Sequence, residues 1–197
     1  MDPWIQIPMQ VVMGLGLAAS AGLRAFLPLL VVGVAGRAGV IPLAGPFEWM
    51  SSTGALIVFG VAVVAEVLAD KIPLIDNALD AGAVFVKPVA GTMLAASMFT
   101  ELGPLEGTVL GIATGGVTAG AVGLAKAKTR LLSTAASAGF ANPWLSIGED
   151  IGSLFGSLAV VFLAPLVAFV IVVLVGIALA VWMVNRSRRA PTGTAGA

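Results

Sequence analysis

Long apolar segments are the feature that most constrains this chain. Each crossing of a bilayer needs roughly 20 apolar residues, because a helix rises about 1.5 Å per residue and the hydrocarbon core is about 30 Å thick. The candidate segments are residues 9–36, 53–70, 83–100, 105–125 and 149–184. Period-2 alternation is absent from them, and an open sheet edge cannot face lipid, so the segments are predicted to be helices.

Composition supports a lipid environment. Of the 197 residues, 59% are hydrophobic and 10% are charged, whereas an average soluble domain is about 25% charged. The polar residues of a soluble protein with this composition could not cover its surface. The sequence therefore predicts an all-α, polytopic transmembrane bundle of about five to six membrane segments with broken or re-entrant helices. Residues 1–185 would form one domain, and 186–197 a disordered tail.

The charged and reactive residues exclude several functions. The formal net charge is zero, and the chain has no Cys and no His. A nucleic-acid interface, disulfides, thiolate or imidazole catalysis and the usual zinc sites are therefore not expected. No cofactor is predicted, and the remaining metal option is a divalent cation held by oxygen atoms.

Basic residues predict the topology. With five crossings, the basic residues other than Arg24 divide five against four between the two sides, whereas an even number gives eight against one. The additional crossing would come from residues 131–148 or from a break near Pro165. Both termini are then predicted to be cytoplasmic.

The first apolar segment, residues 9–36, carries Arg24 near its middle and Pro28 one turn later. An arginine at mid-bilayer costs at least about 2.5 kcal/mol, and a proline leaves a backbone carbonyl in need of a partner. One interpretation is a broken helix whose unwound part faces protein or water. The other is a tilted helix in which a neighbouring acid satisfies Arg24, and the sequence leaves both open.

The pentapeptide AASAG occurs at residues 18–22 and again at 135–139, and a proline follows each copy within six residues. Inverted repeats are a common way to build transporters. Because the chain is rich in Ala and Gly, a match by chance also explains the pattern. The sequence gives only a weak indication of an internal repeat.

Glycines recur at helical spacing in two places. Each GxxxGxxxG stripe puts small residues on one helix face, which lets two backbones approach closely. The stripes predict tight packing within the bundle or a homo-oligomer. The six positions are Gly107, Gly111, Gly115, Gly148, Gly152 and Gly156.

Charge is concentrated in EVLADKIPLIDNALD, residues 66–80. Glu66 and Asp70 are four apart and share a helix face, where like charges repel. An unpaired carboxylate there would take up a proton or bind a cation. The alternative is that Asp70 is solvated in the headgroup region and Lys71 snorkels.

Pro73 is predicted to end this helix, because the residue before a proline disfavours the helical conformation. Asp76 and Asp80 would then lie four apart on a short interfacial helix. They are the candidates for holding a divalent cation, and solvated headgroup-region residues otherwise.

A second acidic pair, Glu149 and Asp150, precedes the last apolar run. Ser146 and Glu149 match a capping box, and acids in the first turn suit the helix dipole. This structural interpretation explains Glu149 better than Asp150. Lys126 and Arg130, again four apart, are available as basic partners.

The elements ASAGLRAFLPLL, ADKIP with the following IDN, and the late GED together resemble a family of small bacterial membrane proteins classed as domain of unknown function 4126. The resemblance covers roughly residues 10–165. It implies a bacterial inner-membrane location and supplies no reaction, substrate or catalytic residue.

Transport or conduction of a small ion or solute is the main functional hypothesis, with the lipid bilayer as the other partner. Ionisable groups inside a membrane are functional candidates by default. The mechanism would pair Arg24 with Glu66 or Asp150 around a polar cavity. The candidate binding residues are Arg24, Glu66, Asp70, Lys71, Glu149 and Asp150.

Two alternatives remain. An intramembrane enzyme would act on a lipid or isoprenoid phosphate with a cation held by Asp76 and Asp80, but the DGxxAR element of one such family is absent. A membrane scaffold would dock a partner through the glycine stripes and use its charges only to tie the bundle. A non-enzymatic role is favoured.

Overall fold

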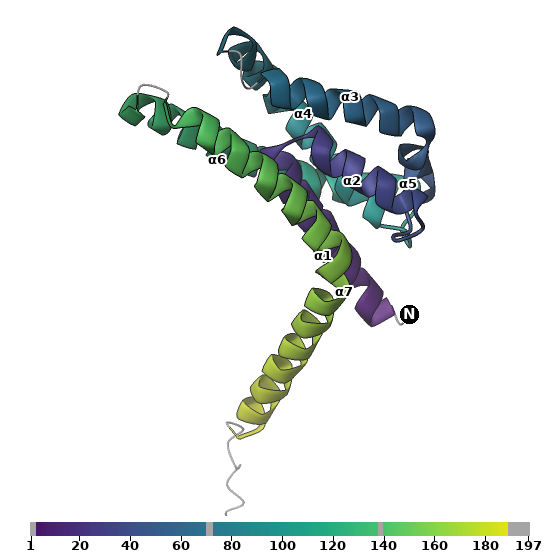
Figure 1. The fold of residues 1–197 in the computed structure, drawn as a ribbon. Helices are drawn as coiled ribbons and strands as arrows, with labels where there is room; N and C mark the ends of the chain where they lie inside the picture. The colour runs from purple at the N-terminus through teal and green to yellow at the C-terminus, as the bar shows by residue number, and fades with distance from the viewer. Residues whose placement is uncertain (1–2, 70–72, 138–139, 189–197) are drawn as a thin grey trace, which may run out of the picture.

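The computed structural model describes residues 3–69, 73–137 and 140–188, and these residues form helices joined by short connections (Figure 1). No strand occurs in this described part of the chain. The elements are α1 (Pro3–Leu23), α2 (Phe26–Arg37), the 3₁₀ helix η1 (Gly45–Ser51), α3 (Thr53–Ala69), α4 (Pro73–Met98), α5 (Pro104–Gly111), the π-helical turn η2 (Ile112–Gly116), α6 (Val117–Ser137) and α7 (Asn142–Arg188).

The first apolar segment is two helices, because the chain reverses direction at Arg24 (Figure 1). Two hydrogen bonds show that the start of α1 and the chain after α2 both lie beside the end of α4. Gln10 Nε2 near the start of α1 donates to Thr100 Oγ1 at 3.0 Å, and the backbone N–H of Ala44, after α2, donates to the oxygen of Ser97 at 2.8 Å. The broken-helix interpretation is therefore correct, and the single tilted helix is wrong.

The remaining predicted segments correspond to helices with shifted ends. Residues 53–70 match α3, whereas α4 begins ten residues before the predicted segment 83–100 and α6 continues to Ser137. Residues 131–148 form no crossing of their own, because their described part completes α6 and begins α7. The reversal at Arg24 instead divides residues 9–36 into two helices.

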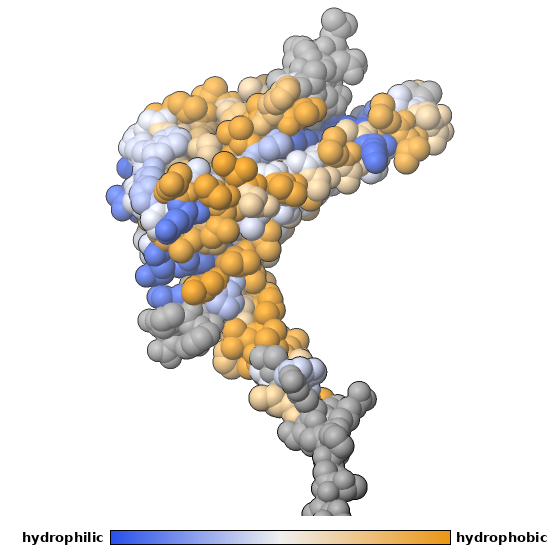
Figure 2. Space-filling model, turned by 180° about the vertical axis from the view of Figure 1, so that it is seen from behind, coloured by the Kyte–Doolittle hydropathy of each residue, from blue (hydrophilic) through white to orange (hydrophobic). Residues whose placement is uncertain are grey.

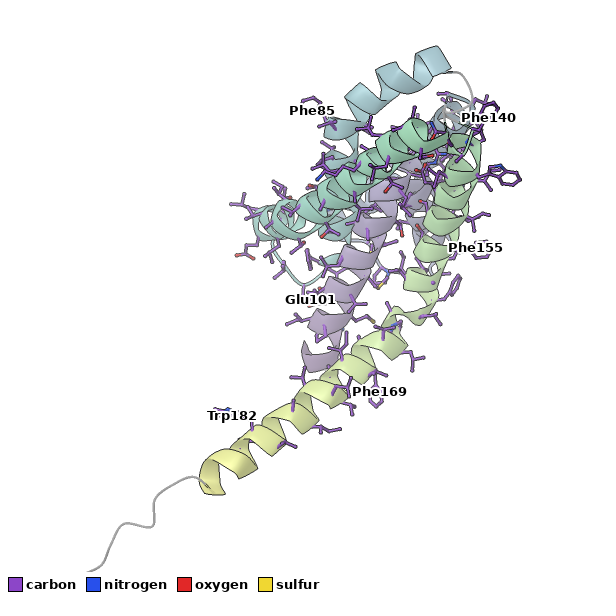
Figure 3. The ribbon with its side chains drawn as sticks, turned by 90° about the vertical axis from the view of Figure 1, so that its left-hand side faces the viewer. Phe85, Glu101, Phe140, Phe155, Phe169 and Trp182 are labelled. Atoms are coloured by element: carbon purple, nitrogen blue, oxygen red, sulfur yellow. The ribbon has the colours of Figure 1, made fainter. Side chains whose placement is uncertain are left out.

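The last helix, α7, continues through Pro165 and bends between Phe155 and Phe169 (Figure 3). Proline explains the bend, because it lacks an N–H group and its ring clashes with the preceding turn. Before the bend α7 lies against the bundle, with Val161 and Ala164 buried. Beyond it, most of the described large apolar side chains are exposed.

Three described helices are long and apolar enough to cross a membrane: Gln6–Leu23, Pro104–Ser137 and Asn142–Met183. A fourth results if η1 and α3, which meet at an angle of 66°, are counted as one span. The helix α2 and the apolar part of α4 are shorter. These helices and the composition indicate a membrane protein, and the count of five to six crossings and the internal repeat stay predictions.

The outward faces of the bundle are apolar, as lipid contact requires. Hydrophobic side chains cover most of the face in Figure 2, where hydrophilic atoms form a narrow band between apolar surfaces at the upper right and a patch along the left edge. On α3 the exposed large side chains are Ile57, Val58, Val61, Val64 and Leu68.

Both glycine stripes face helices of the same chain. A Cβ added to Gly111 would lie 2.7 Å from the Cβ of Ala96, and one on Gly115 would collide with the backbone of α4. In the second stripe, a Cβ on Gly156 would lie 2.9 Å from the Oγ of Ser20 in α1. The contacts of Gly111 and Gly115 need glycine because a side chain there would push α4 away, whereas at Gly156 the Ser20 hydroxyl would have to shift.

The other stripe positions are looser. A Cβ on Gly152 would lie 3.3 Å from Leu23 Cδ1, and one on Gly107 would lie 3.7 Å from Phe99 Cβ. A Cβ on Gly148 would meet nothing within 4 Å. A homo-oligomer formed through these faces stays a prediction.

Candidate functional site

The chain reverses at Arg24 because Pro28 follows four residues later. A proline ring clashes with the carbonyl of the residue four positions before it, but it is tolerated in the first turn of a new helix. The N–H of Arg24 closes the last turn of α1 by donating to Ser20 O at 3.1 Å. The carbonyl of Leu23, at the end of α1, accepts from Lys126 Nζ at 3.1 Å.

Arg24 is buried in this turn, with 1% of its surface exposed. Its Nε lies 2.6 Å from Asp150 Oδ1. Its terminal nitrogens donate to Ser146 Oγ at 2.8 Å and to the backbone oxygen of Glu66 at 3.5 Å. Of the two acids predicted to pair with Arg24, Asp150 forms the ion pair, so α7 is tied to the turn between α1 and α2.

The Glu66 carboxylate serves a different purpose. Oε1 accepts from the backbone N–H of Ala25 at 2.9 Å, and Oε2 accepts from that of Phe26 at 3.3 Å. These N–H groups lie at the start of α2, where a helix has no backbone partners of its own and where negative charge is favourable. A side chain of α3 thus caps α2, and the predicted Arg24–Glu66 contact is made through the backbone oxygen of Glu66.

The carboxylate of Glu149 lies near three basic side chains. Its Oε2 lies 2.8 Å from Lys126 Nζ, 3.3 Å from an Arg130 nitrogen and 4.0 Å from an Arg24 nitrogen. The side chain of Glu149 is only 11% exposed. Lys126 and Arg130 lie one turn apart on α6, so one buried carboxylate binds both. We refer to Arg24, Glu66, Lys126, Arg130, Glu149 and Asp150 as the charged cluster.

The predicted capping box at Ser146 is wrong. The last helix begins at Asn142, one turn earlier, so Ser146 and Glu149 lie inside α7. Pro143 occupies the first turn, where proline is favourable. The hydroxyl of Ser146 accepts a hydrogen bond from Arg24 instead of capping its own helix.

A cavity of about 220 Å³ adjoins the charged cluster, between α3, α4 and the turn at Arg24. Its ionisable lining residues are Arg24, Glu66, Lys87 and Lys126, and the rest of its wall is apolar or glycine. A second cavity of about 180 Å³ lies between α4 and α6. The two cavities share Ala83, Lys87 and Lys126 as lining residues.

Lys87 is the residue that the sequence analysis missed. It is 6% exposed, on the side of α4 that faces α6. The signal was present in the sequence, because Lys87 is the sole charged residue in the predicted segment 83–100 and it precedes Pro88. An ionisable residue inside a membrane segment is a functional candidate by default.

For four other predicted residues the structure describes no side chain at the charged cluster. Asp70 and Lys71 lie outside the described residues. Asp76 and Asp80 belong to the first turns of the long helix α4 and not to a separate short helix, and the structure does not describe their side chains. Among the described residues no three acidic side chains come together to hold a metal ion. The divalent-cation site stays a prediction.

Comparison with known proteins identifies a family and no relative of known activity. No curated protein and no solved structure matches the chain. A family model described as "Domain of unknown function (DUF4126)" matches residues 11–186, so the similarity includes the last helix, beyond the predicted limit at residue 165. The chain therefore belongs to the family that this domain of unknown function defines.

Proposed function

We propose that this protein transports a small ion or solute across the membrane through the 220 Å³ cavity beside the charged cluster. The observation that carries the proposal is the position of this cavity, whose wall includes Arg24, Glu66, Lys87 and Lys126. Sites for drug-sized ligands have volumes of roughly 300–1,000 Å³, so this smaller cavity suits a small ion or solute.

The burial of the charges supports the proposal. Removing a charged group from water costs several kcal/mol even after relaxation, and Arg24, Lys87, Lys126 and Arg130 are each at most 9% exposed. A bundle held together by apolar contacts alone would avoid this cost. Buried charges beside a broken helix are a common arrangement in transporters.

We also propose that the membrane is the bacterial inner membrane and that both termini are cytoplasmic. An even number of crossings would put both termini on one side, and the reversal at Arg24, which divides the first apolar segment into α1 and α2, supports such a topology. The basic residues do not indicate which side of the membrane is cytoplasmic, because they lie at both ends of the bundle. Lys126 and Arg130 of α6 belong to the charged cluster, whereas Arg37 lies at the far end of α2.

The test fills the cavity without changing any charge. Ala62 lines the cavity, whereas its neighbour Val61 is 65% exposed on the outer face of α3. We expect Ala62→Phe to reduce flux at least tenfold in proteoliposomes and Val61→Phe to retain it. Currents in response to K⁺, Na⁺, Cl⁻, phosphate and proton gradients measure ion flux, and stopped-flow light scattering measures uptake of small neutral solutes.

Two results would contradict transport through this cavity. One is the absence of flux for every ion and solute of the panel. The other is equal flux in the Ala62→Phe and Val61→Phe variants. The absence of flux would favour the scaffold hypothesis, in which the charged cluster only holds the helices together. Equal flux in the two variants would mean that the transported molecule does not pass through this cavity.

A further inference from the structure

We infer that the two cavities form one site for a phosphate group, with the apolar part of a phosphate-bearing amphiphile in the cavity between α4 and α6. The inference rests on the proposed function, because it names the class of molecule that the first cavity admits. Three features of the described residues support it: the sign of the charges, the lining residues that the two cavities share and the apolar wall of the second cavity.

The charged groups that line the first cavity favour an anion. Glu66 is the single acid among the lining residues that the structure describes, and both oxygens of its carboxylate accept N–H groups of α2. The other described ionisable lining residues, Arg24, Lys87 and Lys126, are basic. Arg24 and Lys126 are also ion-paired with Asp150 and Glu149, and with Arg130 the described side chains at this site include four basic and three acidic groups. Lysine and arginine donate several charge-assisted hydrogen bonds at once, which matches the several acceptor oxygens of a phosphate.

The second cavity has the character of an acyl-chain groove. Apart from Lys87 and Lys126, its wall consists of Ala83, Val84, Pro88, Gly120, Gly123, Leu124 and Ala127. Val84 and Leu124 are 56% and 59% exposed, so the groove opens at the apolar surface that faces lipid. An extended alkyl chain in this groove would contact apolar side chains and stay out of water.

Lys87 joins the two parts. It lines both cavities, and its stem packs on α6, where a Cβ added to Gly123 would lie 3.0 Å from Lys87 Cδ. A basic side chain between an apolar groove and a charged cavity is the arrangement with which membrane proteins bind lipid headgroups. The phosphate would lie at Lys87, and its hydrophobic part would extend between α4 and α6.

The experiment separates the headgroup from the tail. The thermal unfolding midpoint of the purified full chain in detergent is titrated with dioctanoyl phosphatidic acid, with dioctanoyl phosphatidylcholine and with inorganic phosphate. We expect a saturable rise in the midpoint with phosphatidic acid and none with phosphatidylcholine. A response to inorganic phosphate alone would identify a free anion as the ligand, and a response to phosphatidic acid alone would identify a lipid.

Matched variants locate the site. Lys87→Gln is expected to weaken the apparent affinity for phosphatidic acid at least tenfold, whereas Lys128→Gln, at an exposed position of α6, leaves it unchanged. Gly120→Leu fills the groove without removing a charge, since its Cβ would lie 3.5 Å from Pro88 Cγ. It is expected to abolish the response to the lipid and to spare any response to inorganic phosphate. Gly60→Leu is its control, because a Cβ there meets nothing within 4 Å.

The Gly120→Leu variant keeps the inference testable if Lys87→Gln does not fold. The inference is overturned if phosphatidic acid and phosphatidylcholine raise the midpoint equally, or if Gly120→Leu and Gly60→Leu respond alike to the lipid. Flux without stabilisation by either phosphatidic acid or inorganic phosphate would overturn this inference and leave the proposed function intact. Stabilisation without flux would support the inference and remove transport.

Discussion

Replacing Arg24 by methionine tests the charged cluster directly. The change removes the 2.6 Å ion pair with Asp150 and the hydrogen bonds to Ser146 Oγ and the Glu66 backbone oxygen. Breaking a buried ion pair by removing one partner costs about 3–5 kcal/mol, because the other charge remains without compensation. Asp150 is 28% exposed and so retains some water. We therefore expect Arg24→Met to lower the free energy of unfolding by about 3 kcal/mol, at the lower end of this range.

The reciprocal change is expected to cost less. In Asp150→Asn, Arg24 keeps its hydrogen bond to Ser146 and lies 4.0 Å from the Glu149 carboxylate, so we expect a loss of about 1–2 kcal/mol. In the double variant the carboxylate is no longer left charged without a partner. Its loss should therefore be smaller than the sum of the two single losses by about 1–2 kcal/mol, which is the coupling energy of the pair.

The assay is reversible unfolding in mixed micelles by titration with sodium dodecyl sulfate, followed by the fluorescence of the four tryptophans. Arg37→Met is the matched control, because Arg37 ends the helix that begins beside Arg24 and makes an exposed 2.8 Å hydrogen bond to Thr53 Oγ1. Its loss should be below about 1 kcal/mol. Equal losses for Arg24→Met and Arg37→Met, or strictly additive losses for Arg24 and Asp150, would refute the reasoning.

Three further predictions concern the cap, the helix packing and the topology. Glu66→Ala removes the acceptor of two N–H groups at the start of α2 and should lower the free energy of unfolding by about 1–2 kcal/mol, whereas Glu66→Gln, which retains one oxygen, should cost less in the same titration. Gly111→Ala forces a Cβ to within 2.7 Å of α4 and should cost about 1–3 kcal/mol, whereas Gly148→Ala, which meets nothing within 4 Å, should cost nothing measurable. Cysteines added at the two termini of this cysteine-free chain should react with an impermeant maleimide from the same side of the membrane, and reaction from opposite sides would contradict an even number of passes.

The sequence predicted the helices well because their signal is local. Apolar length alone located the segments that became α3, α4, the α5–α6 run and α7. It did not separate α1 from α2, because the hydropathy of residues 9–36 is continuous across the break. Arg24 and Pro28 indicated a break without giving its angle. That angle depends on contacts with α3, α6 and α7, which are far away in the sequence.

The sequence predicted most residues of the site but not all of the contacts between them. Arg24, Glu66, Glu149 and Asp150 come together, and Lys126 and Arg130 supply the expected basic partners of Glu149. The sequence did not predict that the Glu66 carboxylate would bind backbone N–H groups. A cap supplied by another helix leaves no pattern of spacing in the sequence, unlike a capping box, whose members lie three residues apart.

The reversal at Arg24 explains why charge gathers at this end of the bundle. A helix end carries partial charge on its unsatisfied backbone groups, negative at the end of α1 and positive at the start of α2. The cation of Lys126 binds the carbonyl of Leu23, and the carboxylate of Glu66 binds the N–H groups of α2. Side chains of α6 and α3 thus replace the water that an exposed turn would bind.

Lys126 and Glu66 also line the 220 Å³ cavity, so the groups that stabilise the turn and the groups that would meet a transported ion are the same. Neutralising either one therefore changes the fold and the cavity together, and a loss of flux in such a variant would not distinguish the two roles. Ala62→Phe and Gly120→Leu alter the volume of the cavities and leave every charge in place. Loss of flux or of lipid binding in these two variants, with the free energy of unfolding unchanged, would assign the cavities a function separate from the stability of the bundle.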